Sequence, residues 1–286
     1  MKICHECGAS YNFEKCSVCS CKVEIINGFL AFSPKLAMQN DGFDPKAHAC
    51  LSEIEEGNFW FESRNMLIFW AIQRYFPQIT TFCEVGCGTG FVLSGMADTF
   101  PNVQLNGSEI YSKILSFTQE RVPKATLFQA DICKFPYEDE FELIGAFDVL
   151  EHIEDDNIAL KNIHNALKSR GGIILTVPHH KWLWSVHDEA AFHKRRYSKK
   201  ELLHKVEDAG FQVLKVSSFV SLLLPLMIFS RVCLKRVKNG SMDEEFKLSP
   251  ILNKLFFDLS SFERKLIKSG YNLPFGSSLL VAGQKK

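Results

Sequence analysis

The chain alternates between short apolar runs and amphipathic segments from about residue 79 to its end. The runs of strand length are TTFCEV, VQLNGSE, ATLFQA, LIGAFDVL, GGIILTVP and FQVLKVSSF, and GSSLLVAGQKK closes the chain. The segments between them predict helices over residues 90–100, 112–121, 155–169 and 198–209. Strands that alternate with helices form a mostly parallel sheet with helices on both faces, so we expect an α/β fold.

Two further helices are predicted outside this alternation. Apolar residues recur at helical spacing from Glu53 to Phe76, which predicts a helix with a large aromatic face. We expect this helix to pack on the sheet domain, and a lid over a ligand is the alternative. A second amphipathic helix is expected over about Ile251–Lys268.

The stretch FVSLLLPLMIFSRVCLKRVK, residues 219–238, is strongly apolar. Its first sixteen residues carry one charge, Arg231, and three basic residues follow closely. The stretch is too short and too interrupted by proline to predict a membrane span. We expect it to lie in a membrane interface with its basic end on anionic headgroups. A buried helix or a dimer contact is the alternative, and the helix near residues 251–268 could pair with it.

Five of the ten cysteines fall within the first 21 residues. Cys4 and Cys7 form one C-x-x-C pair, and Cys16 and Cys19 form a second. Two such pairs place four thiolates on two tight turns, the tetrahedral set that a structural zinc ion prefers. Cys21 could replace Cys19, His5 is a weaker alternative ligand, and a degenerate ribbon without metal is also conceivable. A segment of about 35 residues buries little core, so we expect zinc to stabilise it.

Composition narrows the class of protein. Hydrophobic residues make up 46% and charged residues 23% of the chain, as in folded globular proteins. The formal net charge of +0 argues against a nucleic-acid partner. No signal-peptide pattern opens the chain, and the clustered cysteines suggest metal binding in a reducing compartment. We therefore expect a cytoplasmic protein.

The stretch TFCEVGCGTGF contains three glycines at alternate positions, Gly86, Gly88 and Gly90, between a predicted strand and a predicted helix. This spacing differs from the G-x-G-x-x-G pattern of dinucleotide-binding folds, and no Walker lysine follows. A turn this rich in glycine lets a ligand approach the backbone closely. In a parallel sheet such a ligand lies beyond the carboxyl ends of the strands.

One acidic residue lies at the end of each of four successive strands: Glu84, Glu109, Asp131 and Asp148. A carboxylate at Glu109 can accept hydrogen bonds from both ribose hydroxyls, and one at Asp131 can accept from an adenine amine. Each acid alone could instead cap the helix that follows it. The four together predict a site for a nucleoside without phosphates.

The motifs EVGCGTG, ADIC and FDVLEHI, with Glu109 between the first two, resemble the ordered motifs of class I S-adenosylmethionine-dependent methyltransferases. The resemblance covers about residues 80–218 and the final strand. It implies a Rossmann-like, doubly wound sheet of seven strands whose terminal strand is antiparallel, with S-adenosylmethionine as the cofactor. The cofactor-binding residues that we predict are Glu84, Gly86, Cys87, Gly88, Gly90, Glu109, Ile110, Asp131, Ile132 and Asp148.

The stretches NFWFESRN, VPHHKWLWS and HKRRYSKKEL further resemble a bacterial, type 11/23-like subgroup of these enzymes. In that subgroup an N-terminal zinc-ribbon-like segment is common, and many members act in cell-envelope or polyprenyl-linked sugar metabolism. The expected parts are a zinc-ribbon-like segment (1–35), a linker and helical cap (36–78), the methyltransferase core (79–218), a helical insert (219–275) and the final core strand (276–286).

Methyl transfer from a sulfonium is an in-line displacement, so the enzyme must align the acceptor. A hydroxyl acceptor also needs a base, and histidine suits neutral pH. We predict His152 as the catalytic base and His187 as the next candidate; the alternative for His152 is a ring that packs under the cofactor. The predicted acceptor contacts are His179, His193, Arg195, Arg196 and Tyr197, because paired arginines can bind an anion. The alternative is a polar loop that caps the helix after Ser198.

These residues predict a methyltransferase for a small-molecule or lipid-linked, anionic acceptor, with oxygen as the methylated atom. One alternative is an RNA methyltransferase that uses the zinc ribbon to hold RNA, although no NPPY-like motif follows the fourth strand. The other is a non-catalytic subunit that binds S-adenosylmethionine. The free cysteines Cys50, Cys83, Cys87, Cys133 and Cys233 are expected to be packing residues rather than nucleophiles.

Overall fold

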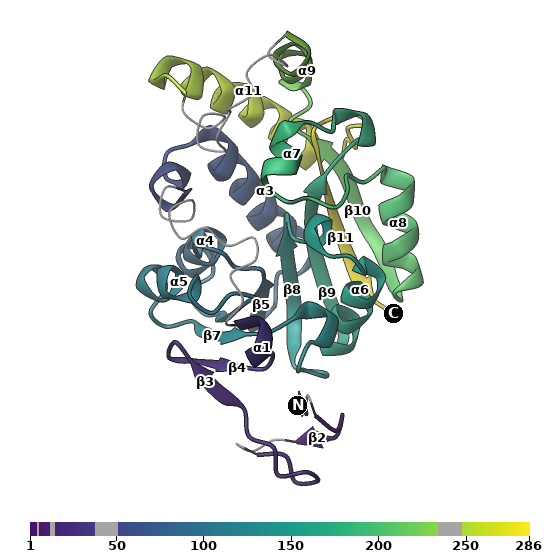
Figure 1. Cartoon of the computed structure of the whole chain (residues 1–286). Coiled ribbons are helices and arrows are strands. Elements are labelled where there is room, and N and C mark those ends of the chain that lie inside the picture. Colours follow the sequence, from purple (N-terminus) through teal and green to yellow (C-terminus); the bar gives the residue numbers. More distant parts are fainter. Residues whose placement is uncertain (5, 12–14, 38–50, 234–247) are drawn as a thin grey trace.

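The computed structural model describes residues 1–4, 6–11, 15–37, 51–233 and 248–286. Within these residues the main sheet has nine strands (Figure 1). In spatial order they are β10 (Phe211–Phe219), β11 (Ser278–Lys285), β9 (Leu167–Pro178), β8 (Phe141–Phe147), β5 (Thr81–Val85), β6 (Gln104–Glu109), β7 (Thr126–Gln129), β4 (Phe29–Ala31) and β3 (Glu24–Ile26).

Seven of these strands form the sheet that the motifs implied. The strands from β9 through β8, β5 and β6 to β7 are parallel, and β11 is antiparallel to both of its neighbours. This order leaves β5 in the middle of the sheet, so the glycine turn that follows it lies at a central strand end. The fold class is therefore confirmed.

The sheet is wider than the expected seven strands because the N-terminal segment adds β3 and β4. Leu30 and Ala31 of β4 pair in parallel with the carboxyl end of β7, and β3 pairs with β4 as a hairpin. The hairpin turn is Asn27-Gly28, whose φ values of 52° and 89° are those of a type I′ turn. This dipeptide is a strong hairpin signal, and our sequence analysis overlooked it.

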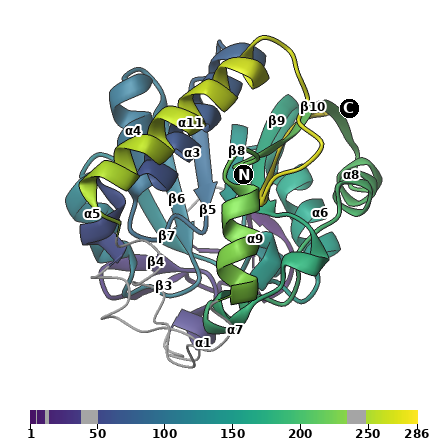
Figure 2. The same ribbon diagram turned by 90° about the horizontal axis from the view of Figure 1, so that it is seen from above.

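Two apolar cores lie on opposite faces of the sheet. One face is covered by α3 (Phe59–Tyr75), α4 (Phe91–Thr99) and α5 (Leu115–Arg121), and the other by α6 (Asp156–Ala166) and α8 (Lys199–Asp208). The predicted helix over residues 155–169 ends earlier, at Ala166, because Leu167 already pairs with Phe141 as the first residue of β9. Figure 2 shows the helices on either side of the sheet.

The helical insert before β11 contains α9 (Leu224–Cys233) and α11 (Pro250–Lys268). The helix α11 packs along α3, where the rings of Phe256 and Phe59 meet edge-on at 5.3 Å. The Asn253 side chain accepts a hydrogen bond from the Phe59 amide (2.9 Å) and donates one to the Gly57 carbonyl (2.7 Å). The insert therefore holds the start of α3, which lies beside the site.

The stretch 219–238 is helical only in part of its described length. Glu263 of α11 accepts hydrogen bonds from the amides of Ser221 (2.6 Å) and Leu222 (3.0 Å), just before α9 begins. This contact gives the two insert helices the link that the sequence suggested. Residues 234–238, with the three basic side chains, lie outside the described residues. Among the residues that are described, no helix is both long enough and apolar enough to cross a membrane.

Gln129 offers a test of how the N-terminal segment is attached. Its side chain is fully buried, accepts a hydrogen bond from the Ser33 amide (2.9 Å) and donates one to the Ile110 carbonyl (2.9 Å). Gln129→Leu removes the partners of two part-buried backbone groups, so we expect the free energy of unfolding to fall by about 2 kcal/mol, roughly 1 kcal/mol for each hydrogen bond. Urea denaturation measures this change. Gln73→Leu, exposed on α3, is the control, and equal midpoints for the two variants would contradict the assignment.

Candidate active site

The glycine turn at the end of β5 combines close packing at two glycines with open space beside the third. Gly86, Gly88 and Gly90 have φ values of 68°, 51° and 81°, which side chains disfavour. A Cβ at Gly86 would lie 2.5 Å from Val149, and one at Gly90 would lie 2.8 Å from Thr118. A Cβ at Gly88 would meet nothing within 4 Å. The outer glycines are therefore required by packing, and the middle one presents backbone that a ligand can approach.

Glu109 lies directly beside this turn. Its carboxylate accepts hydrogen bonds from the amides of Gly88 (3.1 Å) and Ile110 (2.7 Å), and the residue is 9% exposed. The contacts join the end of β6 to the turn after β5. Each carboxylate oxygen can accept more than one hydrogen bond, so Glu109 can hold the turn and still receive ribose hydroxyls.

Asp131 follows β7 and performs the capping role that the sequence left open. Its Oδ1 accepts a hydrogen bond from the Cys133 amide (2.8 Å), which starts the short 3₁₀ helix η1 (Ile132–Lys134). Its own amide donates to the Ser33 hydroxyl (3.3 Å), so the N-terminal segment borders this strand end. The cap uses one carboxylate oxygen, and the other can still accept from an adenine amine. Ile132 is buried next to it.

Glu84 is a buried acid whose charge is poorly compensated. It is 3% exposed, and its Oε2 has no hydrogen-bond partner among the described residues. Burial raises the pKa of Glu84 well above its usual range; nearby Arg64 opposes this shift, while Glu55 and Glu109 add to it. A cationic group of a ligand would relieve the cost of ionising this carboxyl.

Arg64 is a site residue that our sequence analysis missed. It lies on α3, is 8% exposed, and its Nη1 forms an ion pair with Asp148 Oδ2 at 2.6 Å. Its guanidinium lies over the Trp60 ring at 4.6 Å. Asp148, at the end of β8, also accepts from the Thr176 hydroxyl (3.2 Å) and has a left-handed φ of 57°. The stretch NFWFESRN carried a family resemblance, but nothing in its spacing indicates that Arg64 faces Asp148.

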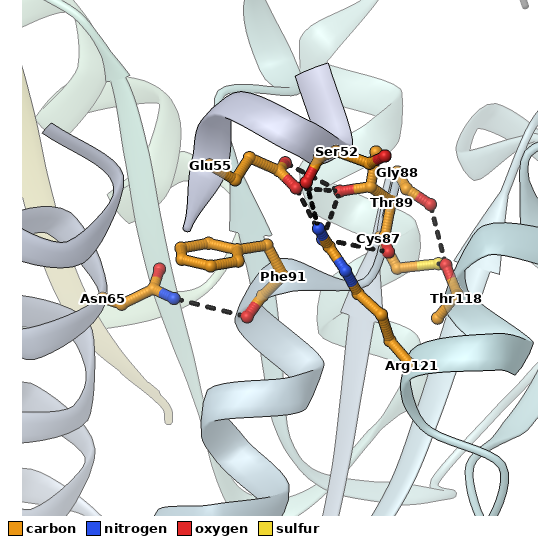
Figure 3. A network of polar contacts seen from close by, with 9 residues as sticks. All are labelled: Ser52, Glu55, Asn65, Cys87, Gly88, Thr89, Phe91, Thr118 and Arg121. Carbon is orange, nitrogen blue, oxygen red and sulfur yellow. Dashed lines mark hydrogen bonds and ion pairs between the residues drawn. The ribbon is translucent and has the colours of Figure 1, made fainter. Parts of the chain in front are cut away.

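The segment before α3 is fastened to the glycine turn (Figure 3). Residues 51–55 are helical, and Glu55 is buried there. Its carboxylate accepts hydrogen bonds from the Thr89 hydroxyl (2.7 Å) and from Arg121 Nη1 (2.5 Å). Arg121 Nη2 donates to the Ser52 carbonyl (2.7 Å). The helix α3 thus packs on the sheet as expected, while the shorter segment before it lies against the turn.

His152 belongs to a group of ionisable residues just past β8. It ends the 3₁₀ helix η2 (Leu150–His152), and its ring meets that of His193 at 4.8 Å and 80°. The ring is reachable from solvent, yet the surrounding protein lowers the pKa of His152 to about 4, mainly by desolvation and then by the neighbouring His193. The neighbouring Glu151 is fully buried. The structure therefore places His152 and His193 together, as two of the predicted site residues.

Three other residues that were predicted to contact the acceptor form ion pairs or hydrogen bonds within the protein instead. Arg196 Nε pairs with Asp188 at 2.7 Å, and Arg195 Nη1 lies 3.2 Å from Asp156 Oδ2. Tyr197 is fully buried and donates to Asp156 Oδ2 (2.7 Å). Tyr197 is thus placed beneath the loop and not where an acceptor could touch it. The role of the two arginines in binding an anion stays a prediction.

The two remaining predicted histidines lie after β9. His179 is 2% exposed, and its Nδ1 lies 3.1 Å from the Ser218 hydroxyl. His187 is half-buried on the short helix α7 (Val186–Ala190). Burial of His179 leaves its neighbour His180 as the ring that is closer to solvent, and the two rings stack at 3.5 Å. For His179 to contact an acceptor, the His180 ring would have to move away from the His179 ring.

The N-terminal cysteines converge as the spacing predicted. The sulfur atoms of Cys4, Cys7, Cys16 and Cys19 all lie within 4.8 Å of one another. Cys21 is outside this set, and His5 lies outside the described residues. Four thiols on two turns fit a structural zinc ion. Hydrogen bonds from the backbone of Cys19 and Val18 lower the pKa of Cys16 to about 6, whereas the pKa of Cys19 is raised to about 12, with desolvation among the causes. The thiolate of the cluster is therefore favoured at Cys16 and not at Cys19.

The cysteine cluster is attached at the end of the sheet opposite the glycine turn. The strands β1 (Lys2–Ile3) and β2 (Ser10–Tyr11) form a small separate sheet. The Ile3 amide donates a hydrogen bond to the Pro136 carbonyl (2.8 Å), and Lys2 forms an antiparallel β-bridge with Tyr137. Both partners lie just before β8 begins. Figure 1 shows β2 and the insert helices at opposite ends of the molecule.

The sheet order, the bare turn and the acids at four strand ends define a class I S-adenosylmethionine-dependent methyltransferase fold. A family model described as a methyltransferase domain matches residues 34–216, which is more than half of the chain. The chain belongs to this methyltransferase-domain family.

Two curated relatives are named malonyl-[acyl-carrier protein] O-methyltransferase. The one from Bacillus cereus is 23% identical over 147 residues, which covers 46% of this chain and 55% of the relative. The one from Priestia megaterium is 21% identical over 105 residues, which covers 36% of this chain and 38% of the relative. The chain thus spans about half of the first relative and less of the second.

Solved structures support the fold. Phosphoethanolamine N-methyltransferase 2 of Haemonchus contortus, in complex with S-adenosyl-L-methionine, has a TM-score of 0.58 at 18% identity, covering 90% of this chain and 60% of that chain. The [4+2]-cyclase SpnF has a TM-score of 0.54 at 15% identity, covering 79% and 82%. Proteins with such different names share this fold, so the acceptor must be argued from the site.

The cysteine cluster can be tested by metal content. We expect Cys16→Ser to lose the zinc bound by the four-cysteine set and to lower the thermal stability of the N-terminal segment, because the metal replaces a hydrophobic core there. Cys21→Ser is the matched control and should retain zinc. Atomic emission on the purified full chain measures the metal. Zinc loss in Cys21→Ser, with retention in Cys16→Ser, would contradict the ligand assignment.

We expect Glu84→Gln to raise the stability of the protein and to weaken cofactor binding. Because the folded-state pKa of Glu84 is raised, the folded state binds the proton more tightly, and stability falls as pH rises above the unfolded pKa. Glutamine avoids this ionisation, so we expect a higher melting midpoint than wild type at about pH 8 and a smaller difference near pH 5. Cofactor affinity should fall at least about tenfold, roughly 1.4 kcal/mol.

Differential scanning fluorimetry and calorimetry measure the two effects. Glu120→Gln, exposed on α5, is the control and should change neither quantity. A Glu84→Gln protein that binds S-adenosylmethionine as tightly as wild type would show that the buried carboxylate does not contact the cofactor.

Proposed function

We propose that the chain transfers the methyl group of S-adenosylmethionine to an oxygen atom of a small-molecule or lipid-linked, anionic acceptor. The observation that carries the proposal is the set of carboxylates around the turn at Gly88, where a Cβ would meet nothing within 4 Å. Glu84 and Glu109 border that turn, and Asp148 lies at the next strand end, beside His152. The names of the curated relatives favour oxygen as the methylated atom.

The cofactor, when bound, supplies a methyl group that its sulfonium already makes electrophilic. Glu84 suits the ammonium group of the methionine part, because its carboxyl is buried and forms no ion pair within the part of the chain that the structure describes. Glu109 suits the ribose hydroxyls, and Asp131 suits the adenine amine. Arg64 holds Asp148 in place through their ion pair. These residues bind and orient the cofactor, and none of them needs to exchange a proton with it.

The acceptor side of the site is assigned to the residues past β8 and β9. His152, with His187 as the second candidate, would take the proton that an acceptor hydroxyl releases as its oxygen bonds to the methyl carbon. The support for His152 is its place at the end of η2, shortly after Asp148 and at the strand end next to the glycine turn. Arg195 and Arg196 are half-buried or buried and paired with acids, so an anionic acceptor would have to compete with these pairs.

Exposed apolar side chains support a lipid-linked acceptor and peripheral membrane contact. They lie after β9 and around α9: Trp182, Trp184, Val186, Phe192, Leu222, Leu226, Phe229 and Phe275 are each at least 40% exposed. His180 connects part of this set, since its ring lies 5.2 Å from Trp182 and 6.0 Å from Phe275. Figures 1 and 2 show α7 and α9 at the same end of the molecule. Apolar side chains grouped in this way are typical of an interaction surface.

The RNA alternative is less well supported. The net charge is +0, and the cysteine cluster that would hold RNA attaches before β8, at the sheet end opposite the glycine turn. An RNA held by the cluster would have to pass along the length of the sheet to reach the cofactor. A non-catalytic subunit would have the same cofactor site and differs only in the absence of turnover.

Methyl-labelled S-adenosylmethionine tests the proposal. The purified chain is incubated with a lysate of cells that lack it, and products are divided into organic-soluble, small aqueous, protein and nuclease-sensitive fractions. We expect base-labile or ether-linked label in the organic or small aqueous fraction. Glu109→Ala should abolish this label, because the ribose contact is lost. Label in the nuclease-sensitive fraction would favour the RNA alternative, and no label despite cofactor binding would favour the non-catalytic subunit.

A further inference from the structure

Glu151 is the most unusual side chain near the acceptor side of the site. It is fully buried, and both of its carboxylate oxygens lack a hydrogen-bond partner among the described residues. A buried carboxyl group without partners is costly, and such groups are normally hydrogen-bonded, paired or bound to a metal. Its backbone is held in place, since the Lys194 amide donates to the Glu151 carbonyl (2.7 Å).

Two histidines complete a ligand set around this carboxyl. One ligand atom from each of Glu151, His152 and His193 lies within 4.8 Å of the other two. The three residues come from two separate segments, η2 and the turn after α7, so their convergence is a product of the fold. Two imidazoles and one carboxylate form a mixed nitrogen and oxygen donor set, which suits divalent transition metals such as zinc better than magnesium or calcium.

His193 also has the outer partner that is typical of a metal ligand. Asp188 is buried, and its Oδ1 lies 2.9 Å from Nδ1 of His193, which leaves Nε2 of that ring for a metal. Asp188 is itself held by Arg196 Nε at 2.7 Å. A carboxylate partner of this kind orients an imidazole and selects its tautomer.

We propose that Glu151, His152 and His193 form a binding site for one divalent transition-metal ion, zinc-like in its preferences, beside the strand end that carries Asp148. The site is separate from the four-cysteine cluster, which docks before β8. Three protein ligands leave coordination positions open, which is typical of a catalytic rather than a structural metal.

This inference rests on the proposed function for its role in catalysis. An acceptor hydroxyl that coordinates the metal loses its proton to solvent more readily, since a Lewis acid stabilises the oxyanion. An oxygen lone pair then forms the bond to the methyl carbon while the carbon–sulfur bond breaks, giving the O-methyl product and S-adenosylhomocysteine. His152 would act as a ligand in this scheme, and the metal would take over the task that was assigned to a histidine base.

Metal counting on the full chain tests the site without any need for turnover. After equilibrium dialysis against buffered zinc, we expect two zinc ions per wild-type chain and one in Cys16→Ser. Glu151→Gln and His193→Gln should each retain the cysteine-bound ion and bind the second at least about tenfold more weakly. His204→Gln, whose ring is 76% exposed on α8, is the matched control and should still bind two.

Cobalt substitution locates each ion. Thiolate-to-cobalt absorption should be unchanged in Glu151→Gln and lost in Cys16→Ser. The absorption of the second cobalt ion should be lost in Glu151→Gln and unchanged in Cys16→Ser. A wild-type chain that holds only the cysteine-bound ion, or a second ion that persists at full affinity in both Glu151→Gln and His193→Gln, would overturn the site. Calorimetric binding of S-adenosylmethionine by both variants checks that the fold is intact.

The labelling experiment separates this inference from the proposed function. A second zinc ion that depends on Glu151, together with no methyl transfer to any fraction, would leave the metal site standing and refute the proposed activity. Methyl transfer at an undiminished rate by Glu151→Gln would overturn the catalytic role of the metal and leave the methyltransferase assignment standing.

Discussion

The burial of several carboxyl groups at one end of the sheet is the constraint on which the rest of the site depends. Glu84 and Glu151 are buried without full compensation, and Asp148 is held by Arg64 at 2.6 Å. Glu109 is stabilised by backbone amides instead. Such an arrangement is unfavourable for an empty protein, because buried carboxylates repel one another and lack water. It is suited to ligands that bring positive charge or hydrogen-bond donors.

The additions on either side of the core hold this arrangement together. The insert helix α11 packs on α3 and so positions the helix that carries Arg64. Arg121 fastens the segment at Glu55 to the glycine turn. Gln129 joins the N-terminal strand region to the loop after β6. Segments far apart in the chain thus share one task, which is to fix the strand ends on which a cofactor would lie.

The molecule has two distinct ends with different physical character. The cysteine cluster lies before β8, where a metal can replace a hydrophobic core for a short segment. Exposed aromatic and aliphatic side chains lie instead on α7, on α9 and in the segments beside them. The histidines past β8 lie toward this second end, so an apolar acceptor would reach the histidine side of the site without passing the cysteine cluster.

Sequence patterns were enough to predict the alternating fold, the glycine turn, the acid at each of four strand ends and the four-cysteine set. These features depend on local spacing, because a strand end, a turn and a C-x-x-C pair each form within a few residues. Folding of the whole chain, in contrast, brings Arg64 against Asp148, 84 positions away, and His193 close to Glu151. It also buried Tyr197 and His179, which the sequence placed at the acceptor, and joined residues 24–31 to the sheet. Contacts of this kind arise from packing between distant segments, and no local periodicity encodes them.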